Sequence, residues 1–277
     1  MYRVQMEEFK KMIISCANEK GGTGKTSTTA LISWELSNMG YKVLIVDCDP
    51  QANLTDLMIK TKSHENSSIT IDPSLFALLI NGKDLNDGII NIKNGLDLIP
   101  AAADMNLFSR WVDKQDIDEK AKVSYLKNSL SNISSKFDFV FLDVSPTMSL
   151  TNDNVFMCCD WIIVMLQTQQ RALLGAKSFL SYLQTNLIDE FGAKVDVAGI
   201  LPVLTKGQSI IDNAVLKQAV EEFGEDNIFE NVITAMERVK RYDLTGITES
   251  SRSVWDKATH STYTAVATEL ISRLEAE

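Results

Sequence analysis

One stretch near the N-terminus, E-K-G-G-T-G-K-T at residues 19–26, restricts most strongly what this chain can fold into. It lies between an apolar run at residues 12–17 and a segment of helical character at residues 26–38. Glycines let a backbone curl around an anion with its N–H groups pointing inward, and a helix start adds partial positive charge. The order strand, Gly-rich loop and helix therefore predicts a phosphate-binding loop.

In such a loop Lys25 would reach the β- and γ-phosphates of a nucleotide, and the Thr26 hydroxyl would be a ligand of Mg²⁺. The loop departs from the general pattern G-x-x-x-x-G-K-[ST] because Glu19 stands at the first glycine position. The alternative is a Gly-rich turn whose lysine faces solvent. The residues predicted to bind the nucleotide are Gly21, Gly22, Thr23, Gly24, Lys25, Thr26 and Ser27.

The rest of the chain alternates apolar strand candidates with helical segments, which predicts an α/β fold with a mostly parallel, twisted sheet and helices on both faces. The predicted strands are residues 12–17, 42–47, 137–143, 160–166 and 195–204, with a hairpin of 89–92 and 96–100 around Asn94-Gly95. The predicted helices are residues 26–38, 74–80, 119–131, 152–157, 172–188, 210–222 and 256–274. We expect a polar extension at residues 1–11, a single domain at 12–277 and a loop at 61–68.

Two of the predicted strands end in carboxylates. The strand at 42–47 runs into Asp47 and Asp49, and the strand at 137–143 ends at Asp143. The carboxyl ends of parallel strands meet at the edge where α/β sheets bind ligands, so Asp49 and Asp143 are candidates for the Mg²⁺ site. The alternative is that they only end strands at the surface.

Taken together, K-G-G-x-G-K-T at 20–26, D-x-D-P-Q at 47–51 and D-x-S-P at 143–146 resemble the deviant Walker A motif and following acidic motifs of the ParA/MinD family. This resemblance implies a SIMIBI-type P-loop NTPase that binds ATP and Mg²⁺. It implies that Asp49 is needed for hydrolysis, that Asp47 supports the site from behind and that Asp143 binds Mg²⁺. The family usually has proline where this chain has Ser145.

In this family the extra lysine, here Lys20, reaches across a dimer interface to the partner's ATP, as an arginine finger does in other NTPases. Lys20 could instead act within its own subunit. The resemblance implies a ParA/Soj-type DNA-partitioning ATPase, whose ATP-dependent homodimer binds DNA without sequence preference. A centromere-binding partner of the ParB type would stimulate a slow ATPase. The alternatives are a MinD-like positioning ATPase, a small-molecule amide-forming synthetase and a bacterial tyrosine kinase.

The resemblance also implies contacts with adenine and with DNA. Adenine contacts are expected from Thr205 and residues 233–236. The net charge of −10 argues against general attraction to nucleic acid, so DNA binding would need a local basic patch. Such a patch could also be an ordinary solvated face. The basic candidates are Lys206, Lys217, Arg238, Lys240 and Arg241, and Gln208 stands where some relatives carry arginine.

Composition and hydropathy favour a cytoplasmic protein without membrane attachment, and the resemblance to the ParA/MinD family implies association with the nucleoid. We find no secretory signal and no apolar run of the ~18 residues that a membrane-spanning helix needs. The predicted last helix carries an apolar stripe typical of core packing, at Tyr263, Val266, Ala267, Leu270 and Leu274. The cysteines, Cys16, Cys48, Cys158 and Cys159, lie in or beside apolar segments and are expected to be buried free thiols.

Overall fold

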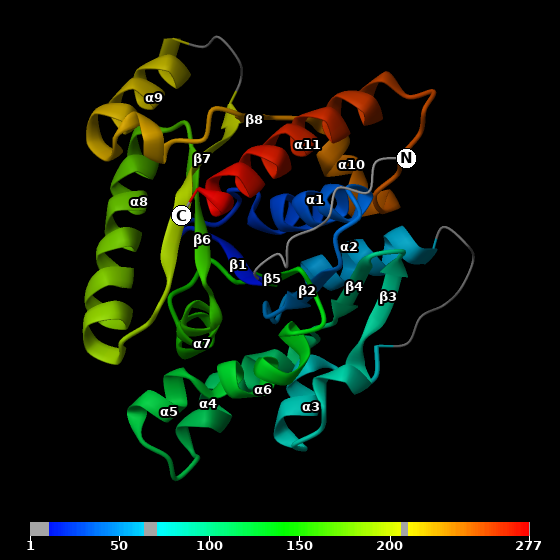
Figure 1. Cartoon of the computed structure of the whole chain (residues 1–277), viewed down its shortest axis with the longest axis vertical. Helices are drawn as coiled ribbons and strands as arrows, with labels where there is room; N and C mark the ends of the chain where they lie inside the picture. The colour runs from blue at the N-terminus through cyan, green and yellow to red at the C-terminus, as the bar shows by residue number, and fades with distance from the viewer. Residues whose placement is uncertain (1–10, 64–70, 206–209, 277) are drawn as a thin grey trace.

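The computed structural model describes residues 11–63, 71–205 and 210–276. Its middle layer is an eight-stranded sheet with the order β3-β4-β2-β5-β1-β6-β7-β8 (Figure 1). All neighbouring strands run parallel except β3 and β4, which form an antiparallel hairpin. The strands are β1 Met12–Ala17, β2 Val43–Asp47, β3 Ile90–Lys93, β4 Leu96–Ile99, β5 Phe139–Asp143, β6 Trp161–Gln167, β7 Asp196–Thr205 and β8 Ile233–Thr234.

Helices cover both faces of the sheet, because successive strand residues point to opposite sides. In β1, Ile14 and Cys16 pack into one core and Ala17 into the other. The first core is covered by α1 Lys25–Asn38, α2 Asn53–Lys62, α10 Glu237–Thr245 and α11 Val254–Glu275. The second is covered by α3 Leu75–Ile80, α4 Phe108–Asp113, α5 Glu119–Val123, α6 Tyr125–Ser134, α7 Leu150–Cys158, α8 Gln170–Tyr182 and α9 Ile210–Phe223.

The predicted fold class is confirmed, and so are the hairpin and the buried strands around the Gly-rich loop. The apolar stripe of α11 is buried as predicted, and all four cysteines are buried and free. Among the described residues no helix is long and apolar enough to cross a bilayer. Residues 1–10 lie outside the described residues, and the extension and the single domain stay predictions.

Several elements differ from the predictions. The predicted helix 119–131 is two helices that meet at Ser124, where the buried Asn154 side chain intervenes: its Oδ1 accepts from Leu126 N and its Nδ2 donates to Lys122 O. The predicted helix 172–188 is α8 followed by a π-helical turn, Leu183–Asp189. Residues 61 and 62 belong to α2 rather than to a loop, and 64–70 lie outside the described residues. The elements α2, α4, β8 and α10 were not predicted.

Candidate functional site

The Gly-rich loop joins the end of β1 to the start of α1. Gly22 and Gly24 have φ angles of +73° and +79°, a region that residues with a Cβ rarely adopt. Gly24 immediately precedes Lys25, the first residue of α1, whose first-turn N–H groups have no partners within the helix. The loop therefore presents backbone donors and a helix start to the same cavity, as a phosphate group requires.

Lys25 is held inside this loop. Its Nζ donates to the carbonyl oxygens of Asn18 and Lys20, at 3.2 Å each. Burial lowers the pKa of Lys25, while the nearby carboxylates of Asp143 and Asp49 act in the opposite direction. Asn18 was not predicted: its Oδ1 accepts from Lys20 N at 2.7 Å and its Nδ2 donates to Met165 O, which fastens the loop to β6.

Thr26 and Asp143 form an oxygen-rich pair at the carboxyl edge of the sheet. Thr26 Oγ1 donates to Asp143 Oδ2 at 2.8 Å. The other oxygen, Asp143 Oδ1, is buried and has no hydrogen-bond partner among the described residues. Burial, together with the neighbouring Asp47, raises the pKa of Asp143 well above its usual range. A hard cation would supply the missing partner and stabilise the charged carboxylate, so the residues present fit Mg²⁺.

Asp47 and Asp49 differ in what surrounds them. Asp47 is fully buried: one oxygen accepts from Asp49 N at 3.0 Å, and the other accepts from Thr55 N at 2.9 Å and Thr55 Oγ1 at 2.7 Å. Asp49 lines the phosphate cavity, and its Oδ1 accepts from Gln51 N at 2.9 Å. Asp47 thus fixes the turn that carries Asp49 and the start of α2.

The phosphate cavity has a volume of about 540 Å³. All seven predicted nucleotide-binding residues from Gly21 to Ser27 line it, together with Asp49. Its remaining wall includes Asp56 of α2 and Asp243 of α10, which were not predicted. The helical spacing of Leu54, Leu57, Met58 and Thr61, all buried, is a signal that could have found α2.

Lys20 lies at the mouth of the loop and does not line the phosphate cavity. Its Nζ donates to Gln169 Oε1 at 2.7 Å and to Gln167 Oε1 at 3.3 Å, at the end of β6. The two lysines of the loop therefore occupy different places. Lys25 points into the cavity, and Lys20 is held outside it.

The segment after Asp143 is tied to α7. Asn152 Nδ2 donates to Ser145 O at 2.8 Å, and Ser145 Oγ donates to Asn152 Oδ1 at 3.3 Å. Val144 and Pro146, on either side of Ser145, line the phosphate cavity. The serine that replaces the usual proline thus adds a side-chain link between the cavity wall and a helix.

The predicted adenine-binding residues lie together where β7 and β8 end. Ala235 N donates to Thr205 O at 2.9 Å, and Thr205 Oγ1 is buried without a partner among the described residues. Thr234, Ala235 and Met236 line a second cavity of about 570 Å³, which shares no lining residue with the phosphate cavity.

The predicted basic residues do not form one patch. Lys217 lies on α9, far from α10, which carries the other three described candidates (Figure 1). Lys217 Nζ is 3.8 Å from Glu221 Oε1, and Lys240 Nζ is 2.7 Å from Glu237 Oε1. Arg238 forms an ion pair with the buried Asp256, while Arg241 is exposed. Lys206 and Gln208 lie outside the described residues.

This chain is similar to known proteins in sequence and in structure. The model of the AAA domain family matches residues 11–196. The chromosome-partitioning ATPase Soj of Thermus thermophilus is 26% identical over 262 residues, which cover 95% of this chain and 96% of Soj.

Two solved structures share the fold across almost the whole chain. One is a plasmid partition protein of Borrelia burgdorferi bound to AMPPNP, with a TM-score of 0.72 and 22% identity, covering 94% of this chain and 99% of that one. The other is cobyrinic acid a,c-diamide synthase of Mycobacterium smegmatis with bound ADP and magnesium, with a TM-score of 0.73 and 22% identity, covering 95% of both chains.

Proposed function

This chain belongs to the AAA domain family and is a P-loop ATPase of the ParA/Soj type, and we propose that it partitions DNA. ATP would drive two copies into a dimer that binds DNA without sequence preference. Hydrolysis, stimulated by a centromere-binding partner of the ParB type, would release the DNA. Soj, which matches nearly the full length of this chain, is a chromosome-partitioning ATPase, and this supports the assignment.

The observation that carries the proposal is the position of Lys20. Its ammonium group lies outside its own phosphate cavity, bound to Gln167 and Gln169. This supports a role on the nucleotide of a second subunit rather than on its own. A cation supplied by the partner neutralises charge during phosphoryl transfer and makes dimerisation depend on ATP.

Each site residue has a distinct task in the proposed reaction. The loop N–H groups and Lys25 bind the phosphates, because they are the donors that face the cavity. Asp49 orients the attacking water or acts through the Mg²⁺ shell, and Asp47 holds the Asp49 turn in place. Thr26 and Asp143 would hold Mg²⁺, with Asp143 bound through water. Bound Mg²⁺ would neutralise charge on the phosphates.

The proposal also requires a basic residue that binds DNA. Of the basic candidates, Arg241 is the described residue whose side chain is exposed and has no ion pair among the described residues. Arg238 is a poor test of DNA binding because Arg238→Ala would leave the buried Asp256 carboxylate without its cation. We therefore expect Arg241→Ala to weaken ATP-dependent DNA binding and to lower its salt dependence.

The decisive experiment is sizing by light scattering with and without ATP. We expect wild type to change from monomer to dimer with ATP, Asp49→Ala to trap the dimer, and Lys20→Gln to abolish it. Lys257→Gln removes an exposed lysine elsewhere and is the matched control. If ATP binds and every variant stays monomeric, the role of Lys20 on a partner subunit is wrong.

The same preparation separates the alternatives. An amide-forming synthetase would raise its ATP turnover with a small acceptor substrate and not with DNA. A MinD-like ATPase would sediment with liposomes when ATP is present. The partitioning ATPase is expected to do neither and to respond to DNA and its centromere-binding partner.

A further inference from the structure

The proposed reaction needs Lys20 on the nucleotide of a second subunit, but in its own subunit two neutral side chains hold it. Lys20 Nζ donates to Gln169 Oε1 at 2.7 Å and to Gln167 Oε1 at 3.3 Å. Lys20 forms no ion pair among the described residues. The ammonium group therefore keeps its full positive charge while the two amide oxygens hold it.

The backbone on both sides of this contact is fixed. Lys20 N donates to Asn18 Oδ1 at 2.7 Å, and Asn18 Nδ2 donates to Met165 O, which fastens the lysine backbone to β6. The other side lies at the junction of β6 and α8, where Gln169 O accepts from Ala172 N at 2.8 Å. The Lys20 side chain can therefore change partners while the backbone around it stays in place.

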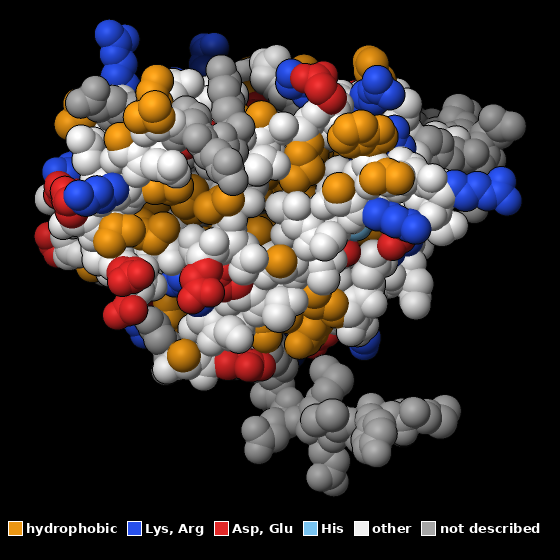
Figure 2. Space-filling view, turned by 90° about the horizontal axis from the view of Figure 1, so that it is seen from above, with side chains coloured by type: hydrophobic (Ala, Val, Ile, Leu, Met, Phe, Trp, Pro, Cys, Tyr) orange, Lys and Arg blue, Asp and Glu red, His pale blue; other side chains and the backbone are white. Residues whose placement is uncertain are grey.

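The surface next to this contact is apolar. Leu174, on the second turn of α8, is 67% exposed, and Ile210 and Ile211, at the start of α9, are 88% and 67% exposed. The Thr168 hydroxyl, between the two glutamines, donates to Asp212 of α9 and so brings the start of α9 to this place. Figure 2 shows hydrophobic side chains gathered in its left half, the side on which Figure 1 places α8 and α9. A second copy that covers this surface would also approach the lysine.

We propose that Gln167 and Gln169 are positioning residues, which hold Lys20 in the free subunit and release it to the ATP of the partner when two copies meet. The inference rests on the proposed ATP-dependent dimer and adds a control on its formation. Neutral oxygens suit this task because a phosphate that competes for the ammonium group adds the attraction of opposite charges. A carboxylate in the same place would offer that attraction as well and would keep the lysine.

Two substitutions at Gln169 should therefore change dimer formation in opposite directions. Gln169→Ala removes the shorter hydrogen bond, and each dimer releases two lysines. We expect the dimer to tighten by about tenfold, about threefold for each subunit. Gln169→Glu keeps the shape of the side chain and adds a negative charge, so the dimer should weaken by about tenfold or more. A residue that only stabilises the local fold would weaken the dimer in both variants.

Sedimentation velocity over a series of protein concentrations with ATP measures the dissociation constant of the dimer. Every protein in this series carries Asp49→Ala, which we expect to prevent hydrolysis during the run. Gln167→Ala, which removes the longer hydrogen bond, should act in the same direction as Gln169→Ala but less strongly.

A second measurement reports on the contact in the monomer, without ATP. An amine-reactive N-hydroxysuccinimide ester labels Lys20, and mass spectrometry gives the rate of labelling. We expect Gln169→Ala to raise this rate and Gln169→Glu to lower it. The exposed Lys257 of the same molecules is the internal control, and its rate should stay unchanged.

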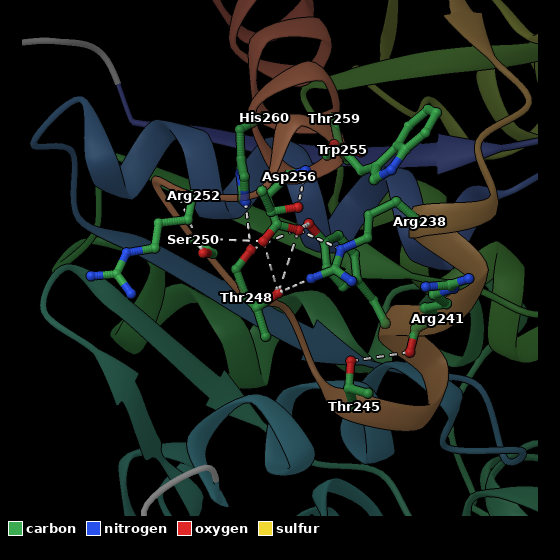
Figure 3. A network of polar contacts seen from close by, with 12 residues as sticks. Arg238, Arg241, Thr245, Thr248, Ser250, Arg252, Trp255, Asp256, Thr259 and His260 are labelled. Atoms are coloured by element: carbon green, nitrogen blue, oxygen red, sulfur yellow. Dashed lines mark hydrogen bonds and ion pairs between the residues drawn. The ribbon is translucent and has the colours of Figure 1, made fainter.

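Gln169→Glu also lowers the net charge of the chain by one unit, so the series needs a charge control. Arg252→Gln makes the same change in the loop before α11, and Figure 3 shows the Arg252 side chain directed away from the polar network beside it. In this loop Glu249 accepts from Asn38 at the end of α1, whereas Lys20 precedes the start of this helix of 14 residues, which is about 20 Å long. Arg252→Gln should leave dimer formation unchanged.

Three results would overturn the inference and leave the proposed function in place. They are no tightening of the dimer by Gln169→Ala, equal weakening by Gln169→Glu and Arg252→Gln, and unchanged labelling of Lys20 in both Gln169 variants. If Asp49→Ala alone stays monomeric with ATP, the proposed dimer itself is wrong. The labelling rates then show separately whether the glutamines hold Lys20.

Discussion

Thr55 on α2 provides a quantitative test of how the Asp49 turn is held. Thr55 Oγ1 donates to Asp47 Oδ2 at 2.7 Å and accepts from Ala101 N at 3.0 Å, and all three residues are buried. Thr55→Val keeps the shape of the side chain and removes both hydrogen bonds. The Asp47 oxygen then retains Thr55 N, at 2.9 Å, and Ala101 N loses the Thr55 hydroxyl.

The expected cost follows from these two losses. A hydrogen bond to a charged group contributes about 1.5–3 kcal/mol, and a buried N–H left unpaired costs about 1–3 kcal/mol. Because the two losses share one hydroxyl and are not fully additive, we expect the free energy of unfolding to fall by about 3 kcal/mol. At about 2 °C per kcal/mol for a chain of this size, Tm should fall by about 6 °C.

Urea unfolding followed by circular dichroism measures this change, with the slope m expected to stay constant. Thr55→Ser restores the hydroxyl and should recover most of the loss. Thr268→Val is the control, since Thr268 is exposed and its hydroxyl, among the described residues, bonds only the carbonyl of Thr264 one turn earlier. A loss for Thr55→Val no larger than that for Thr268→Val would refute the reasoning.

Thr55→Val should also separate ATP binding from hydrolysis. Asp47 accepts a hydrogen bond from the backbone N–H of Asp49. A less restrained Asp47 side chain therefore lets the Asp49 turn shift while the phosphate loop is unchanged. We expect affinity for ATP to stay near that of wild type while the rate of hydrolysis falls about tenfold. Equal losses in both would indicate that the variant disturbs the whole site.

Three further predictions address other parts of the molecule. Burial alone would lower the pKa of His260, but the hydrogen bonds with Glu35 and with the Thr248 carbonyl outweigh it and raise the pKa. The resulting stabilisation is complete below the unfolded-state pKa of about 6.5 and is lost as pH rises through the folded-state pKa. The free energy of unfolding of His260→Gln, measured in urea, should therefore lack this part of the pH dependence. Thr26→Val should weaken ATP binding in Mg²⁺ but not in EDTA, as measured by calorimetry. Gly246→Ala should lower the free energy of unfolding, measured in urea, by more than about 3 kcal/mol, because the φ of Gly246 is +75° and a Cβ there would lie 2.5 Å from Thr61 N. Gly22→Ala should cost about 1 kcal/mol, because a Cβ at Gly22 would have no atom within 4 Å.

The centre of the fold could be predicted because its signals are local. An apolar run followed by glycines, or by an acid, shows where a buried strand ends. The topology then brings Lys25, Asp49 and Asp143 to one edge of the sheet, and the structure places all three around the phosphate loop. The roles of these residues stay predictions, because they depend on a bound nucleotide.

The walls around the site could not be predicted because distant residues stabilise them. The helix α10 has the sequence E-R-V-K-R-Y-D-L-T, and Tyr242 is the residue that it buries. Its place is fixed by contacts across more than 180 residues: Lys60 Nζ donates to Asp243 O at 2.7 Å, and Ile247 N donates to Thr61 Oγ1 at 2.8 Å. No pattern within nine residues of mostly polar sequence indicates these partners.

The helix α10 contributes residues to both cavities. Asp243, near the end of α10, lines the phosphate cavity, and Arg241, two residues earlier, lines the second cavity together with Trp255. Between them the buried Tyr242 hydroxyl donates to Asp256 Oδ1 at 3.0 Å, and Asp256 follows Trp255 in α11. Because a short helix moves as a rigid unit, a shift of Asp243 displaces Arg241 relative to Trp255. We therefore expect Tyr242→Phe, which removes this hydroxyl, to make DNA binding depend less on ATP. An unchanged ATP dependence of DNA binding would show that the two cavities act independently.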